Sequence, residues 1–272
     1  MRYLDKNHFM PDYKNTEEPV EELVGAGSEI AGGAAGAAIG LLIGGPTGAV
    51  LGGAGGPAVA RAIRHLAIEF NQRVLGEREE ARVGATIAFG VEKVQQNITN
   101  GQQVRQDSFF QEQFGDRAAA EEIFEGVLLV AQREYQEKKL RFYGNLVANI
   151  AFHPEIDRDH ANVLIKAGEE VSYRQMCLLA LFILRDRGYF ALRRGDYRGG
   201  VEISFTLVVL LEEIYQLFQR GVLGLPGDTL LGVTDVNPAG MKVYGTGTDL
   251  YNLMELWEID AQDLSQLALL LQ

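Results

Sequence analysis

Cysteine is nearly absent from this chain: Cys177 is the only one among 272 residues. An intrachain disulfide is therefore excluded, and a lone thiol is typical of proteins from a reducing compartment. The neighbours of Cys177 in "QMCLLALF" are mostly apolar. This surrounding predicts a buried core residue rather than a reactive thiol.

Histidine is scarce as well, and the four histidines form no HxxxH or HExxH pair. They are His8, His65, His153 and His160. A metal site therefore has little support. The stretch "HPEIDRDH", residues 153–160, could gather His153, Glu155, Asp157, Asp159 and His160 around an ion. The favoured interpretation is a solvated loop between helices in which Asp157 caps the second helix.

Motifs that bind nucleotides or perform catalysis are also missing. "GAGSEIAGG" and "GTGTD" contain glycine, but neither has the Lys-Ser/Thr pair of a P-loop and neither follows a Rossmann strand. No nucleophile, base and orienting group can be assembled from the sequence. We therefore expect no enzymatic activity, no cofactor and no metal.

Basic residues are rare in the last quarter of the chain. Residues 201–272 contain 2 basic and 10 acidic side chains, residues 61–200 contain 20 of each, and the whole chain has a net charge of −12. An acidic surface repels phosphate backbones. We therefore expect no binding of nucleic acid, and contacts with other proteins instead.

Charge is absent from residue 30 to residue 60, and this stretch is rich in glycine. Glycine recurs there at every fourth position: Gly32, Gly36, Gly40, Gly44, Gly48, Gly52 and Gly56. On a helix this spacing places all seven on one face, where another backbone can approach closely, as in helix pairs within membranes. A flexible linker is the alternative, but linkers do not keep a period of four or interleave large apolar residues.

The remaining residues of this stretch suggest how it would meet a membrane. Large apolar side chains lie between the glycines, among them Ile39, Leu42 and Ile43. Pro46 would either kink one spanning helix or turn a re-entrant hairpin, and both remain open. The apolar side chains supply only about −2 to −4 kcal/mol of insertion free energy. We therefore expect the segment to be kept against its own protein in water and to insert only when several copies pack together.

The sequence on either side divides into an arm and a helical region. Residues 1–29 form a polar, acidic arm that resembles neither a secretory signal nor a transit peptide. Residues 61–188 predict amphipathic helices: one to about Gly76, one from about Glu79, a long one from Asp116 to Phe152, a short one after Asp157, and one between Ser172 and Gly188.

The region of residues 60–185 resembles a known family. The similar features are an acidic helix leading into "LRFYGNLVANI", a break containing histidine and proline, a helix with the sequence "HANVLIKAGEEVS", and a leucine-rich helix. These features resemble the Abi-alpha family of bacterial abortive-infection proteins. The resemblance implies a role in defence against phage through cell suicide, and it brings no catalytic residues. The glycine segment lies outside the matched part.

Residues 189–272 predict a small α+β module. "GYFALRRGDYRGGVEISF" is typical of a β-hairpin, "TLVVLLEEIYQLFQRGVLG" of a helix stopped by glycine, and the end of the chain of a strand followed by a final helix. This order is similar to a winged helix. The expected fold is thus mainly α: a helical bundle (61–188), a glycine-zipper segment (30–60) and a winged-helix-like module (189–272).

Together these patterns favour a membrane-active, pore-forming effector of antiviral defence. It would be cytoplasmic at rest, form homo-oligomers when triggered, and disrupt the inner membrane through its glycine zipper. Its expected partners are further copies of itself, the membrane when activated, and a sensor or regulator protein. The alternative is a soluble structural or adaptor protein whose glycine segment packs subunits together without contacting lipid.

Overall fold

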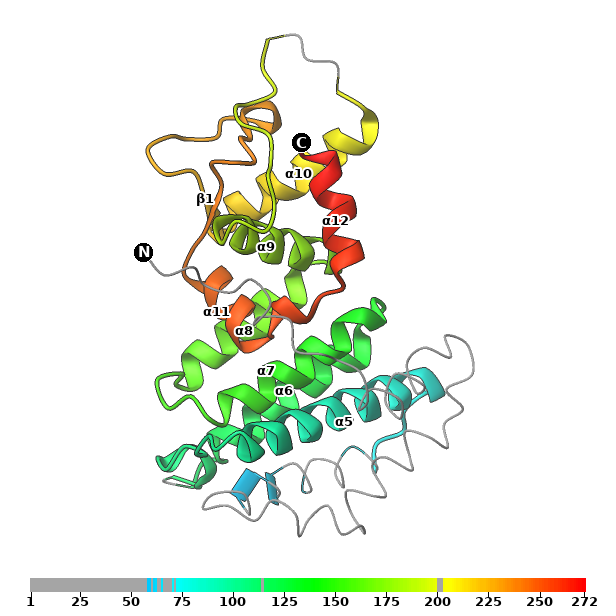
Figure 1. The fold of residues 1–272 in the computed structure, drawn as a ribbon. Helices are drawn as coiled ribbons and strands as arrows, with labels where there is room; N and C mark the ends of the chain where they lie inside the picture. The colour runs from blue at the N-terminus through cyan, green and yellow to red at the C-terminus, as the bar shows by residue number, and fades with distance from the viewer. Residues whose placement is uncertain are drawn as a thin grey trace.

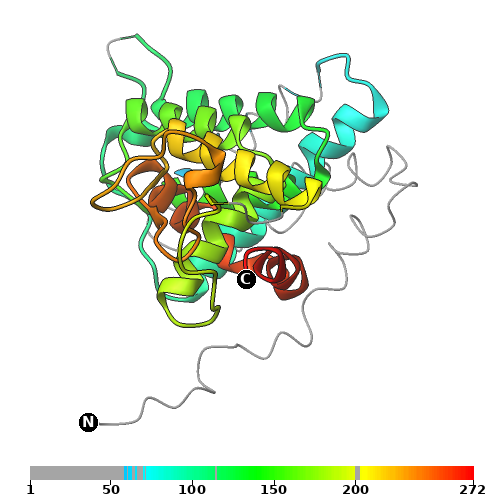
Figure 2. The same cartoon turned by 90° about the horizontal axis from the view of Figure 1, so that it is seen from above.

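The computed structural model describes residues 58–59, 61–62, 65, 70, 72–113, 115–199 and 203–272. Within this part of the chain, eight α-helices and one two-stranded sheet make the protein mainly helical, as the sequence predicts. Helices α5, α6 and α7 form a layer at one end, α9, α10 and α12 lie at the other, and α8 and α11 lie between them (Figures 1 and 2).

The first layer contains α5 (Glu77–Thr99), α6 (Ala119–Arg133) and α7 (Leu140–Ile150). A short 3-10 turn precedes each of the last two helices: η1 (Ser108–Phe110) lies before α6, and η2 (Glu137–Lys139) lies before α7. Helix α5 begins two residues before the predicted start at about Glu79. The Glu79 carboxylate accepts the Gly76 backbone N–H at 2.9 Å. This contact satisfies one of the free donors at the helix start.

The long helix predicted from Asp116 to Phe152 is wrong, because the chain breaks between α6 and α7. Its first part begins after Ala118, and Glu134 adopts an extended backbone. The Glu134 carboxylate turns inward, where it accepts the Gln136 N–H at 2.9 Å and the Tyr143 hydroxyl at 2.9 Å. The apolar periodicity of the sequence predicts that the helix continues past Arg133. These contacts of Glu134 form instead, and the helix ends there.

The next two helices begin at the predicted caps. Asp157 precedes α8 (Arg158–Glu170) and accepts the His160 N–H at 2.8 Å. Ser172 precedes α9 (Tyr173–Asp186) and forms a reciprocal capping box with Gln175. Both contacts satisfy N–H groups that have no partner inside the helix.

The hairpin predicted within residues 189–205 is wrong for the residues there that the structure describes, since none of them is in a strand. Their backbone N–H groups form hydrogen bonds with distant segments instead. The Arg193 N–H donates to the Leu271 carbonyl at 2.7 Å, and the Tyr197 N–H donates to the Thr234 carbonyl at 2.8 Å. Alternation of side chains therefore did not lead to strand pairing, because other segments supply the hydrogen-bond partners.

The C-terminal part contains α10 (Phe205–Gln219), α11 (Thr246–Leu253) and α12 (Ala261–Leu270), with the turns η3 (Val233–Asp235) and η4 (Leu256–Glu258). The sheet pairs β1 (Leu223–Gly224) with β2 (Lys242–Val243) in antiparallel register. The predicted helix with a glycine stop is confirmed by α10, after which Gly221 has a φ of 72°. This left-handed conformation favours glycine.

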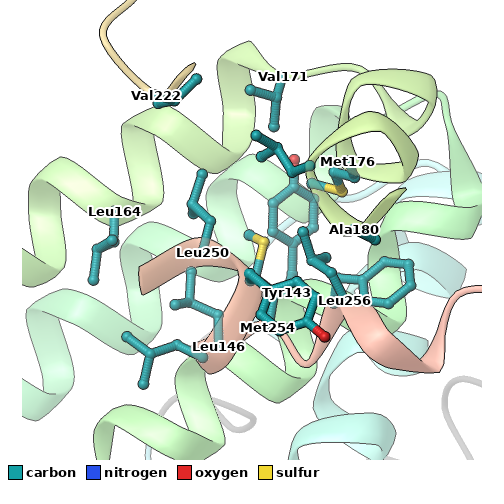
Figure 3. Close-up of a cluster of buried hydrophobic side chains, with 14 of the residues drawn as sticks. Tyr143, Leu146, Leu164, Val171, Met176, Ala180, Val222, Leu250, Met254 and Leu256 are labelled. Atoms are coloured by element: carbon teal, nitrogen blue, oxygen red, sulfur yellow. The ribbon is translucent and has the colours of Figure 1, made fainter. Parts of the chain in front are cut away.

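The main apolar core joins both ends of the molecule. It includes Tyr143 and Leu146 of α7, Met176 and Ala180 of α9, and Met254 (Figure 3). Cys177 is buried in this core as predicted, and burial raises the pKa of its thiol to about 12. A thiol with so high a pKa stays protonated near neutral pH and is inert.

Candidate functional site

The residues predicted to form the membrane-active site lie outside the described part of the chain. They run from Gly32 to Gly56 and include Ile39, Leu42, Ile43 and Pro46. The site analysis therefore concerns the body that follows them. Among its described residues, no helix combines the length and the apolar character needed to cross a membrane.

A buried polar network joins α5 and α7 to the turn between α11 and η4. The Lys93 ammonium of α5 pairs with the Glu255 carboxylate and lies 3.3 Å from an oxygen of Glu258. The side chains of Lys93, Glu255 and Glu258 are each exposed by 12% or less. Charges so buried are stable only when they are paired.

Asparagine side chains from α5 and α7 complete this network. The Asn149 amide donates to the Glu255 carboxylate at 3.0 Å and to the Leu253 carbonyl at 2.9 Å, and its oxygen accepts from Asn97 at 2.8 Å. The Asn145 amide donates to the Met254 carbonyl at 3.1 Å. The asparagines thus satisfy the last carbonyls of α11, which have no partner inside the helix.

The backbone at Glu255 shows how firmly this network fixes the turn. Glu255 has a φ of 57°, and it is the sole non-glycine residue with a positive φ in the described part of the chain. Such a conformation costs on the order of 1–3 kcal/mol and persists only where surrounding contacts offset the cost. The contacts of its carboxylate with Lys93 and Asn149 impose it here.

The charges in the network influence one another. Burial lowers the pKa of Lys93, but the hydrogen bonds and negative charges of Glu255 and Glu258 outweigh it, and the net pKa is raised. Burial raises the pKa of Glu255, and the hydrogen bond from Lys93 opposes this effect. The hydrogen bonds among Lys93, Asn149 and Glu255 tie α5 and α7 to the end of α11.

A second polar feature is a cleft of about 350 Å³ between the α6–η2 connection, the α8–α9 junction and α10. On its lining, the Lys139 ammonium pairs with the Glu134 carboxylate at 2.6 Å and donates to the Glu169 carbonyl at 3.3 Å. Burial lowers the pKa of Lys139 despite Glu134. At the rim, Arg220 donates to the Glu170 carbonyl at 2.6 Å. These cations stabilise the C-terminal end of α8, where the helix dipole is negative.

In the histidine-containing loop, the predicted helix cap at Asp157 is confirmed. His153 contacts Glu155 at 2.6 Å, Asp157 caps α8, and His160 contacts Asp249 of α11 at 3.1 Å. The two histidines therefore have separate partners. In the described ranges, no group of three or more His, Cys, Asp or Glu side chains is placed to hold a metal ion.

Sequence reasoning missed the Lys93–Glu255 network, because Glu255 lies more than 100 residues after both Lys93 and Asn149 in the chain. One signal was available: Asn145 and Asn149 interrupt the apolar run "LRFYGNLVANI" with a spacing of four. Two asparagines on one face of a buried helix require hydrogen-bond partners. The sequence could thus have indicated a buried polar contact, but not its partner.

Comparison with known proteins found no match to a protein-family model, to a curated protein or to a solved structure.

Proposed function

We propose that this protein is a membrane-active effector of bacterial defence against phage, related to the Abi-alpha proteins that residues 60–185 resemble. Triggered copies associate through the glycine segment and breach the inner membrane. The observation that carries the proposal is the strict spacing of the seven glycines within a charge-free stretch. That spacing favours close helix packing in lipid.

In this proposal the helical body restrains and presents the glycine segment. Residues 61–188 act as a helical bundle and residues 189–272 as a winged-helix-like module that contacts further copies or a sensor protein. The acid-rich composition of residues 201–272 supports protein contacts over nucleic acid. The protein stays in the cytoplasm until the trigger arrives.

Replacing Gly40 and Gly44 together by leucine tests the zipper. Leucine raises both helix propensity and insertion energy, so a simple apolar anchor would insert better. A close-packed zipper would instead be wedged apart, and we expect membrane depolarisation in expressing cells to fall about tenfold or more. Dye entry and membrane potential, measured with and without phage infection, provide the readout.

The matched control is Gly45→Ala, which lies outside the four-residue register and is expected to retain most of the activity. If the double leucine variant permeabilises cells as well as the parent, or if the parent never depolarises them, the pore-forming proposal is wrong.

A second candidate, the soluble structural or adaptor protein, is favoured by a contact within the body itself. Gly90 of α5 and Gly144 of α7 meet backbone to backbone, so this chain uses glycines to bring helices together without lipid. The glycine segment would then pack subunits in the same way. Fractionation of infected cells separates the two candidates, since only the effector moves to the membrane fraction.

A further inference from the structure

Helix α10 is apolar on two opposite faces in its first half. The residues that face the main core are apolar and buried: Leu210, Leu211, Ile214 and Leu217. On the opposite face lie Phe205, Val208 and Val209, which follow one another at helical spacing and are here called the α10 stripe. A helix that is apolar all round normally has both faces covered.

The α10 stripe is open instead. Phe205 is 83% exposed, and Val208 and Val209 are partly exposed. Seen from above, the start of α10 is not covered by another described helix (Figure 2). Leu231, which is 80% exposed, lies shortly before η3, and η3 packs against α10. Exposed apolar side chains gathered in this way are typical of interaction sites.

The charges of this part of the molecule are acidic. Glu212 lies two turns after Phe205 on the same face of α10 and is exposed, and the helix has no basic residue. The two basic residues within 201–272 are engaged elsewhere. Arg220 donates to the Glu170 carbonyl at 2.6 Å, and Lys242 pairs with Asp186 at 2.8 Å. The α10 stripe is therefore an apolar surface with a carboxylate at its end.

From this arrangement we infer that the α10 stripe is a docking surface for a cationic amphipathic helix of another protein. The apolar face of that helix lies on Phe205, Val208 and Val209, and a lysine or arginine beside it pairs with Glu212. The net charge of −12 steers such a partner toward the protein. The same charge disfavours other occupants, because a second copy brings another Glu212 and anionic lipid headgroups are repelled.

The inference rests on the proposed function in one respect, since it gives a surface to the protein contact assigned there to residues 189–272. Its test uses the full-length protein and a fluorescein-labelled peptide of leucine and lysine patterned as an amphipathic helix. Fluorescence anisotropy measures binding. We expect Phe205→Ser to weaken binding about tenfold, because truncating an aromatic side chain at the centre of a contact removes much of the affinity.

Leu269→Ser on α12 is the matched control. Leu269 is also a large apolar side chain of the acidic region and is 69% exposed. We expect it to change the affinity less than about twofold. Both side chains are exposed, so both variants should fold and keep melting temperatures within about 2 °C of the parent.

Glu212→Gln tests the charge. It should weaken binding about threefold at low salt and leave the affinity close to that of the parent at high salt, because salt screens exposed charges. No binding by the parent, or equal losses for Phe205→Ser and Leu269→Ser, would overturn the inference.

Two other measurements can reassign the α10 stripe. A dimer in light scattering that Phe205→Ser dissociates would assign it to a second copy. Binding to phosphatidylglycerol vesicles that this variant abolishes would assign it to a membrane, and either result overturns the inference. The peptide measurement involves no membrane. A protein that binds the peptide but never depolarises cells therefore contradicts only the pore-forming function, and one that depolarises cells without binding the peptide contradicts only the docking surface.

Discussion

Gly144→Ala is expected to lower the free energy of unfolding by about 3 kcal/mol, although alanine is the better helix former. Helices α5 and α7 cross at this glycine. A Cβ atom on Gly144 would lie 2.6 Å from the Cβ of Phe89, 2.8 Å from the backbone nitrogen of Gly90 and 2.9 Å from the carbonyl oxygen of Thr86. Two of these atoms are backbone, so relief requires α5 and α7 to move apart.

Moving these helices apart affects more than one contact. Asn145 and Asn149 follow Gly144 on α7 and hold the end of α11 through their side-chain amides. A shift of α7 would lengthen those hydrogen bonds as well as loosen the apolar packing. Overpacking typically costs about 1–3 kcal/mol. The weakened hydrogen bonds of Asn145 and Asn149 add to this cost, so we expect Gly144→Ala to lie at the upper end of that range.

Gly126→Ala on α6 is the control for helix propensity. Its nearest neighbour would be the flexible Cδ1 of Ile165 at 3.4 Å. We therefore expect a gain of about 0.5–1 kcal/mol from the better helix former. Urea denaturation of both variants measures the difference. Equal stabilities for Gly144→Ala and the parent would show that the crossing is looser than the structure indicates.

Local chemistry made the helix starts of this protein predictable. Asp157 and Ser172 are capping residues followed by amphipathic sequence, and α8 and α9 begin after them. The break after Arg133 was not predictable, because the apolar period continues through it. What interrupts the helix is a tertiary contact, the inward turn of Glu134 toward Lys139 and Tyr143. Tertiary contacts override local propensity whenever a buried charge needs its partner.

The candidate functional sites were likewise predictable only where they depend on a local sequence pattern. The glycine register of residues 32–56 is a local pattern, and the sequence alone suggests its use. The Lys93–Glu255 pair depends on which distant segments meet, and no spacing in the sequence contains that information. Asn145 and Asn149 indicated that a partner exists, but only the fold places the end of α11 against them.

Lys93→Met is expected to lower the free energy of unfolding by about 3–5 kcal/mol at pH 7.5, the range found when one member of a buried ion pair is removed. The carboxylates of Glu255 and Glu258 would remain buried without their ammonium partner. The strained turn at Glu255 would also lose one of the contacts that impose it. Lys166→Met, an exposed position on α8, is the matched control and should change stability by no more than about 0.5 kcal/mol.

The pH dependence of this loss identifies its cause. Without Lys93, burial raises the pKa of Glu255 in the folded protein with less opposition. An acid whose pKa is higher in the folded than in the unfolded state takes up a proton on folding, so lower pH favours the folded state. The deficit of Lys93→Met relative to the parent should therefore shrink between pH 7.5 and pH 5, and adding Glu255→Gln should recover part of it at pH 7.5. A deficit that is the same at both pH values would show that lost packing of the lysine stem, rather than the unpaired carboxylate, destabilises the variant.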